Sequence, residues 1–218
     1  MADVLKKNIA FYVPYVIFLV AGLCLLSLYS KPEIHIAANQ YHSVFFDRFF
    51  YYLTFLGDGI FSFSLIVIML FIRFRNFFYM AVGTLLALAV VSLLKNVIFE
   101  GALRPYNYFK WIHPYGLHLI EGVDYNGFNS FPSGHTMSAF CSFLGLAFLV
   151  KNNVIKFLFF LIALLIGYSR VYLSQHFFVD IVFGSIIAVV FMTFSFYFFT
   201  KLSAKWLDKS LIGILKKS

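Results

Sequence analysis

Charged residues are scarce in this sequence. Only 12% of the 218 residues are Asp, Glu, Lys or Arg and only 9 are acidic, whereas 62% are hydrophobic and 31 are Phe. A chain of this composition cannot cover a core with polar side chains, which excludes a soluble globular protein and a disordered one. The sequence therefore predicts an integral membrane protein.

Two further features are missing: a disulfide framework and a basic stripe. The two cysteines, Cys24 and Cys141, each lie inside an apolar run, where we expect them to pack as small apolar residues. The formal net charge is +8, but the basic residues stand in short, scattered groups between apolar runs. A nucleic-acid partner is therefore not expected.

Long apolar runs are what the sequence has instead. A helix needs about 20 residues to cross about 30 Å of hydrocarbon. Six segments reach this length if polar residues are allowed near their ends: 9–30, 53–72, 77–99, 132–150, 154–173 and 177–200. The first is uncharged and longer than the core of a signal peptide, so we expect it to be retained. The predicted fold is all-α, one domain over residues 1–218 with six transmembrane helices in one bundle.

The distribution of Lys and Arg predicts the orientation of these spans, because cytoplasmic connections carry the excess of basic residues. One side holds 11 of them: Lys6, Lys7, Arg73, Arg75, Lys151, Lys156, Lys201, Lys205, Lys209, Lys216 and Lys217. The other holds 6: Lys31, Arg48, Lys95, Arg104, Lys110 and Arg170. Both termini are thus expected in the cytoplasm.

Two connections on the extracytoplasmic side are unusual. Residues 100–131 form the longest one and are rich in Gly and aromatic residues, which is typical of a functional loop and equally of an interfacial aromatic belt. Residues 41–52 mix Asp47 and Arg48 with Phe and Tyr, and we expect a helix in the membrane interface there.

Three polar clusters lie at the extracytoplasmic ends of the expected helices three to six. They are Lys95 with Arg104-Pro105, then Pro132-Ser133-Gly134-His135, then Ser169-Arg170 with His176 and Asp180. Ionisable groups near lipid are costly and usually have a partner and a task. Together the clusters indicate phosphate chemistry.

The third cluster could form a nucleophile. His176 and Asp180 are four residues apart, so on a helix the carboxylate can bond one ring nitrogen and leave the other basic. Arg170 offers a planar fork of donors for two phosphate oxygens.

The other two clusters could supply an acid and an anion site. A helix that begins at Ser133-Gly134 presents unpaired backbone N–H groups, and His135 is then placed to protonate a departing oxygen. Lys95 and Arg104 would add positive charge against the transferring group.

Each residue also has a structural interpretation. Ser133 could cap a helix, Arg170 and Asp180 could form a buried ion pair, and Lys95 could extend to the headgroups. All of them fall on one predicted side of the membrane, and this favours the catalytic interpretation.

The three clusters resemble the signature of the type-2 phosphatidic-acid phosphatase superfamily of membrane lipid phosphatases. The second matches the family's Pro-Ser-Gly-His, and the third its Ser-Arg, five residues, His, three residues, Asp. The first departs from it, because eight residues rather than six separate Lys95 from Arg104. A looser turn at Glu100-Gly101 could absorb the extra two. The resemblance covers about residues 90–185.

The resemblance implies a mechanism and a site. His176 would be the nucleophile that forms a phosphohistidine, Asp180 would orient it, and His135 would protonate the leaving alkoxide. The residues that it assigns to phosphate binding are Lys95, Arg104, Ser133, Gly134 and Arg170. It implies no metal and no cofactor.

The resemblance further implies a phosphatase of the bacterial inner membrane with a periplasmic active site. The family's lipid substrates include lipid A, undecaprenyl pyrophosphate, phosphatidylglycerol phosphate and phosphatidic acid. The small single-domain format and the high Phe and Lys content of the chain are typical of a Gram-negative bacterial source, which slightly favours lipid A. A phosphotransferase with the same intermediate and an anion transporter remain as alternatives. The oligomeric state is left open.

Overall fold

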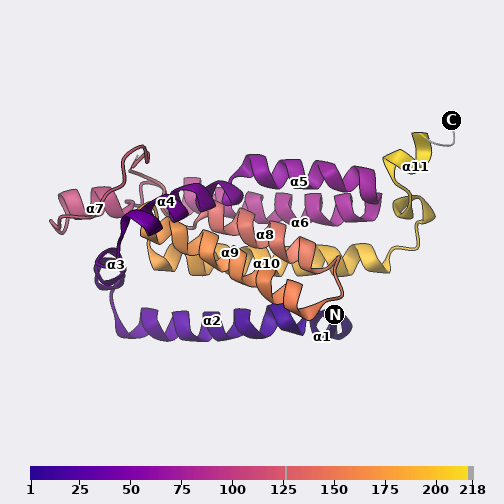
Figure 1. Cartoon of the computed structure of the whole chain (residues 1–218), viewed down its shortest axis with the longest axis horizontal. Coiled ribbons are helices and arrows are strands. Elements are labelled where there is room, and N and C mark those ends of the chain that lie inside the picture. Colours follow the sequence, from indigo (N-terminus) through magenta and orange to yellow (C-terminus); the bar gives the residue numbers. More distant parts are fainter. Residues whose placement is uncertain (126, 216–218) are drawn as a thin grey trace.

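The computed structural model describes residues 1–125 and 127–215, which form an elongated bundle of helices (Figure 1). No strand occurs in this described part. The long helices are α2 (Ile9–Leu28), α5 (Gly59–Ile72), α6 (Phe74–Leu93), α8 (Gly134–Ala147), α9 (Asn153–Tyr172) and α10 (Phe178–Lys201). The short ones are α1 (Ala2–Lys7), α3 (Lys31–Asn39), α4 (Val44–Leu53), α7 (Pro105–Trp111), α11 (Leu211–Leu215), η1 (Thr54–Gly57), η2 (Leu94–Ile98) and η3 (Lys205–Asp208).

The all-α prediction is confirmed, whereas six spans are not. Within the described residues, four helices are long and apolar enough to cross a membrane: α2, α6 with η2, α9 and α10. The segments Val44–Gly57 and Gly59–Ile72 would make a fifth span if counted together, but they meet at a bend of 48°. The expected span 132–150 contains α8, whose 14 residues rise only about 21 Å.

The bend in the second expected span has a local cause. Asp58 has extended backbone angles and caps α5, because its carboxylate accepts a hydrogen bond from the Ile60 N–H at 3.1 Å. The helical chain before it begins at Val44, so the helix expected near residues 41–52 exists as α4 and leads into η1. Whether α4 lies in an interface remains a prediction.

Helix α8 is the centre of the bundle. It packs against α5, α6, α9 and α10, and 11 of its 14 residues are buried. Small side chains permit close packing: a side-chain carbon at Gly145 would lie 2.9 Å from Met80, and one at Gly83 would lie 3.1 Å from Met192. The short α8 is thus surrounded by protein rather than by lipid.

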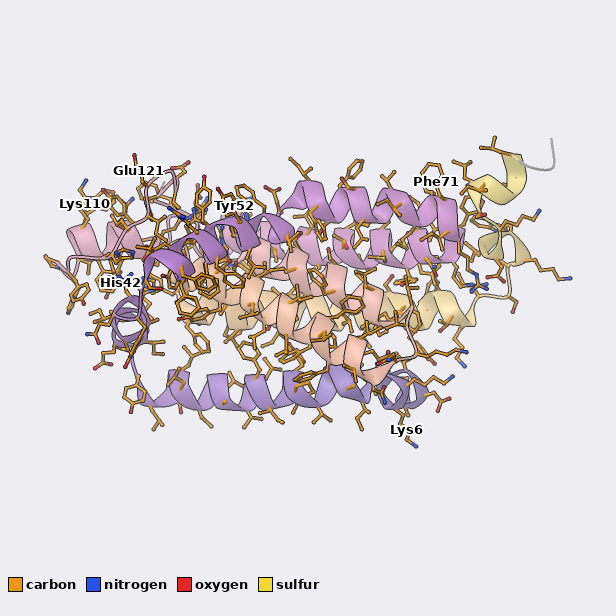
Figure 2. The ribbon with its side chains drawn as sticks, viewed as in Figure 1. Lys6, His42, Tyr52, Phe71, Lys110 and Glu121 are labelled. Atoms are coloured by element: carbon orange, nitrogen blue, oxygen red, sulfur yellow. The ribbon has the colours of Figure 1, made fainter. Side chains whose placement is uncertain are left out.

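The two ends of the bundle differ in content. Helices α1 and α11 lie at one end and α7 at the other (Figure 1). The side chains of His42, Lys110 and Glu121 lie at the α7 end, and Lys6 lies at the α1 end (Figure 2). Nine of the eleven basic residues assigned to the cytoplasm are described, and they lie in or next to α1, the α5–α6 junction, the start of α9, the end of α10 and η3, apart from the loop 100–131. Lys216 and Lys217 lie outside the described residues.

Candidate active site

His176 and Asp180 meet where α10 begins. His176 lies in the connection between α9 and α10, and Asp180 lies in the first turn of α10. The Nδ1 atom of His176 is 3.2 Å from Oδ2 of Asp180, and each residue is only 2% exposed. The same carboxylate oxygen accepts the Phe177 N–H at 3.0 Å. This arrangement fixes the imidazole and leaves Nε2 as the nitrogen available for chemistry.

A residue that the sequence did not single out completes this pair. Ser130 is 2% exposed and donates its hydroxyl hydrogen to Oδ2 of Asp180. Its oxygen also lies 3.5 Å from Nδ1 of His176. Because Ser130 comes from the end of the loop 100–131, this loop contributes directly to the site. The contact favours the functional interpretation of the loop over the interfacial one, and both stay predictions.

Arg170 approaches the pair from the last turn of α9. It is 5% exposed, and its Nη1 donates to the Thr54 hydroxyl in η1 at 2.7 Å. The backbone N–H groups of Gln175 and His176 both donate to the Arg170 carbonyl, so the chain folds back and joins Arg170 to His176. The Arg170 Nε is buried and has no partner among the described residues. The side chain is thus held in place with donor capacity unused.

No ion pair joins Arg170 to Asp180 in the part of the chain that the structure describes. The two residues have different partners, as the bonds above show. The structural interpretation of this pair is therefore wrong.

The Pro-Ser-Gly-His segment begins α8. Ser133 is the N-cap, and its hydroxyl oxygen accepts the Thr136 N–H at 3.3 Å. Its own N–H donates to the Asp180 carbonyl at 3.0 Å, which connects the start of α8 to the first turn of α10. Gly184 permits this approach, since a side-chain carbon there would lie 2.6 Å from the Ser133 carbonyl oxygen. The capping interpretation of Ser133 is confirmed.

The start of α8 is open toward the site. The backbone N–H groups of Gly134 and His135 have no partner among the described residues. A side-chain carbon at Gly134 would meet no atom within 4 Å. Unpaired N–H groups at a helix start, beside free space, form a site that favours an anion.

Lys95 and Arg104 reach the same region through an irregular backbone. Lys95 lies in η2, a five-residue π-helical turn, and the chain then turns at Gly101 with φ of 79°. The Gly101 N–H donates to the Asn129 side chain at 2.9 Å, and the Arg104 N–H donates to the Gly127 carbonyl at the same distance. A π-helical turn accommodates an extra residue in a helix. The π-helical turn and the turn at Gly101 both lie within the longer Lys95–Arg104 segment.

The three polar clusters lie close enough to one another to interact electrostatically. Burial lowers the pKa of the His135 imidazole, and the positive charges of Arg170, Lys95 and Arg104 lower it further. The Nε of Arg104 is also buried without a partner among the described residues. Burial lowers the pKa of Arg104, and the carboxylates of Asp124 and Asp180 oppose this. The structure thus gathers all the cations assigned to the site around one imidazole.

Burial also controls the protonation of the nucleophile candidate. It lowers the pKa of the His176 imidazole below its ordinary value, although the hydrogen bond to Asp180 acts in the opposite direction. The ring is therefore neutral near pH 7, as a nucleophilic nitrogen requires. Among residues 1–125 and 127–215, no group of three His, Cys, Asp or Glu residues is placed to hold a metal ion.

The family is decided by comparison with known proteins. The PAP2 superfamily model matches residues 76–204, more than half of the chain and all three clusters. The chain belongs to the PAP2 superfamily. This confirms the resemblance drawn from the three clusters. No curated protein sequence matches the chain significantly.

Two solved PAP2-like structures share its architecture. LpxE from Aquifex aeolicus is 28% identical, with a TM-score of 0.65, over 76% of this chain and 93% of its own. A PAP2-type phosphatidylglycerolphosphate phosphatase from Bacillus subtilis is 25% identical, with a TM-score of 0.57, over 90% of this chain and 98% of its own. These likenesses and the apolar helices show that the chain is a membrane protein.

Proposed function

We propose that this PAP2 protein is a phosphatase that removes a phosphate from a membrane lipid through a phosphohistidine on His176. The observation that carries the proposal is the buried His176–Asp180 pair beside Arg170, whose Nε is unpaired in the described part of the chain. The substrate is one of four lipids: lipid A, undecaprenyl pyrophosphate, phosphatidylglycerol phosphate or phosphatidic acid. The activity named for the Bacillus subtilis structure supports this class.

In the first step, the Nε2 lone pair of His176 attacks phosphorus and the bond from phosphorus to the lipid oxygen breaks. Asp180 holds Nδ1–H and stabilises the positive charge that develops on the ring. His135 gives its proton to the departing lipid oxygen. A bound phosphate favours the charged imidazolium of His135, because it brings negative charge next to the ring.

The phosphoryl oxygens would bind where the positive groups gather. Arg170 and Arg104 offer guanidinium donors, Lys95 offers an ammonium, and the open N–H groups of Gly134 and His135 add two backbone donors. In phosphoryl transfer the charge is spread over the equatorial oxygens, so preorganised donors stabilise the transition state. In the second step, water attacks the phosphohistidine, the P–N bond breaks, and inorganic phosphate leaves with its oxygen supplied by water.

A groove beside His135 supports a lipid substrate. It has a volume of about 480 Å³, and its walls come from α5, α6 and the start of α8. Its lining is almost entirely apolar, with Phe63, Leu85 and Leu88 facing the same space as Gly134 and His135. An acyl or prenyl chain in this groove would keep its phosphate near the imidazole while the tail stays apolar.

The proposed location is the inner membrane, with both termini cytoplasmic and the active site periplasmic. The basis is the excess of Lys and Arg at the end of the bundle that contains α1 and α11. Cysteine-accessibility labelling from outside the cell tests it: a cysteine placed at Lys110 should react and one at Lys6 should not. The reverse pattern would contradict the orientation.

The decisive experiment is a detergent assay of purified protein against the four lipid phosphates, with release of inorganic phosphate as the readout. We expect hydrolysis of at least one lipid, undiminished by EDTA, and an acid-labile, alkali-stable phosphoenzyme after rapid quenching. Transfer of phosphate to an added alcohol without release to water would instead identify a phosphotransferase. Loss in EDTA that Mg²⁺ restores would contradict the proposed chemistry.

A further inference from the structure

A second cavity lies at the end of the bundle opposite the proposed active site. It has a volume of about 670 Å³ and opens where the α1–α2 junction, the α8–α9 connection and the last turns of α10 meet. Lysines from four elements line it: Lys7, Lys151, Lys156 and Lys201. The proposed phosphatase reaction uses none of them.

Lys156 is built into the wall of this cavity. It is 4% exposed, and its Nζ donates to the Lys7 carbonyl and, at 2.8 Å, to Oδ1 of Asn8. Asn8 is fixed in turn, because its Nδ2 donates to the Val4 carbonyl at 2.8 Å. An ammonium has three N–H donors and two of these have protein acceptors, so one is left for a ligand.

The positive charge of the cavity is not neutralised by the protein. Within the described residues, no ion pair joins any of the four lysines to a carboxylate. Asp3 supplies the only carboxylate in the described lining, against four ammonium groups. A buried cation whose protein partners are neutral gains most from an anionic ligand.

Much of the rest of the wall is apolar. Phe148, Leu149, Val150 and Phe196 line the cavity beside the lysines, and the Nζ of Lys201 lies 5.8 Å from the centre of the Tyr197 ring. The cavity also borders the beginnings of α2 and α9 and the end of α10, three helices able to span a membrane. It therefore lies at the depth of lipid headgroups, with an apolar surface next to its charges.

We propose that this cavity binds the phosphate headgroup of an anionic phospholipid, such as phosphatidylglycerol, from the leaflet on this side of the membrane. The lysines supply compact point charges for the phosphate, and the apolar wall receives the first part of an acyl chain. A free phosphate ion would use the lysines alone. A zwitterionic lipid would bring an ammonium group of its own into a positive cavity.

The test compares two double variants that each remove two positive charges at the same end of the bundle. Lys151→Gln with Lys201→Gln removes exposed lysines that line the cavity, and Lys156 is kept because it is buried. Lys205→Gln with Lys209→Gln removes exposed lysines outside the lining and is the matched control. Binding of fluorescent phosphatidylglycerol to each protein is titrated in neutral detergent.

We expect about thirtyfold weaker binding in the cavity variant, from two headgroup contacts, and a change within about twofold in the control. Phosphatidylcholine should bind the wild type at least tenfold more weakly than phosphatidylglycerol does. Both double variants should hydrolyse the preferred lipid phosphate in detergent at the wild-type rate, which shows that they are folded.

Three results would overturn the proposal. Equal weakening in the two double variants would show that general surface charge attracts the lipid, and unchanged binding in the cavity variant would place the lipid elsewhere, including in the active site. Inorganic phosphate that displaces the lipid at an equal concentration would identify the free anion as the ligand.

Discussion

Two arginines at opposite ends of the bundle illustrate two uses of a guanidinium group. Arg75, at the end where η3 packs on α6, donates from Nε to Asp208 at 2.7 Å and from Nη1 to the carbonyls of Phe199 and Leu202. Arg170, at the other end, has a bond to Thr54 and a buried Nε without a partner in the described part of the chain. Arg75 therefore links α6 to η3 and to the end of α10. Arg170 is held in position by one hydrogen bond and keeps a donor that has no described partner.

The difference supports the proposal that Arg170 belongs to an anion-binding site. Burying an arginine with unused donors is costly, and a purely structural role would remove that cost, as it is removed at Arg75. Among the described residues, the Arg170 side chain has one hydrogen-bond partner, the neutral Thr54 hydroxyl. A bound phosphate would satisfy the remaining donors with charge-assisted hydrogen bonds.

The largest expected effect comes from removing the proposed nucleophile, at the end of the bundle that contains Arg170. His176→Ala should lower phosphate release by about 10⁴-fold or more, because the imidazole nitrogen proposed to form the P–N bond is lost. The fall in the thermal midpoint in detergent should be small, because Asp180 keeps two other donors, the Ser130 hydroxyl and the Phe177 N–H. Activity within tenfold of wild type would exclude a phosphohistidine on this residue.

The next effect tests the two arginines against each other. Arg170→Ala should lower kcat/KM by about 10²- to 10³-fold, the range for loss of a preorganised transition-state donor, while the thermal midpoint is maintained. Arg75→Ala should leave kcat/KM within about twofold and lower the thermal midpoint, because two backbone carbonyls lose their donor at a cost of about 1–3 kcal/mol. Steady-state kinetics and a thermal-shift assay measure both.

The same two variants can contradict the contrast between a phosphate-binding Arg170 and a structural Arg75. A lower thermal midpoint in Arg170→Ala with kcat/KM unchanged would make Arg170 a packing residue. A large loss of kcat/KM in Arg75→Ala would show that the η3 end influences catalysis.

The parts of this site that the sequence predicted are those with local periodicity. His176 and Asp180 are four residues apart, and Ser133 stands at a helix start, so both contacts follow from helical geometry. Apolar runs likewise predicted α2, α6, α9 and α10. These features depend on residues within one or two turns of each other.

The missed features depend on tertiary contacts or on the ends of helices. Ser130 is 50 residues from Asp180 and Thr54 is 116 residues from Arg170, so nothing local marks either partner. The helix within the span expected at 132–150 is shorter than expected, because it begins after the Ser133 cap and ends at Ala147. The long spacing between Lys95 and Arg104 could be recognised in the sequence, but the π-helical turn that contains Lys95 could not.

Lys95 gives an intermediate effect. Lys95→Ala should cost about tenfold in kcat/KM, less than Arg170→Ala, because an ammonium is a single point charge whereas the guanidinium offers a fork of donors. Lys95 interacts electrostatically with Arg104, Asp180 and Arg170, which places its ammonium near the proposed phosphate site. A measurable loss is therefore expected despite the longer spacing. Kinetics of both variants with the same lipid provide the comparison. A loss equal to that of Arg170→Ala would give Lys95 a central place in phosphate binding.

An effect about as small as that of Lys95→Ala is expected at Ser130, which we infer to be a positioning residue. Ser130→Ala should lower kcat by about tenfold with KM unchanged, the loss that corresponds to one hydrogen bond to a charged group. It should also move the acid limb of the kcat/KM profile. Burial lowers the pKa of His176, so in the wild type this limb should lie below pH 6.5.

The direction of that movement follows from the charge on Asp180. Without the Ser130 hydroxyl, the carboxylate keeps more negative charge, raises the pKa of His176 and shifts the acid limb to higher pH. Ser195→Ala is the control, since Ser195 is buried and bonds only to the Tyr79 carbonyl, far along α10. An equal fall in kcat for both variants, with the acid limb unmoved in each, would reduce Ser130 to a packing residue and leave the His176–Asp180 pair oriented by the backbone N–H of Phe177 alone.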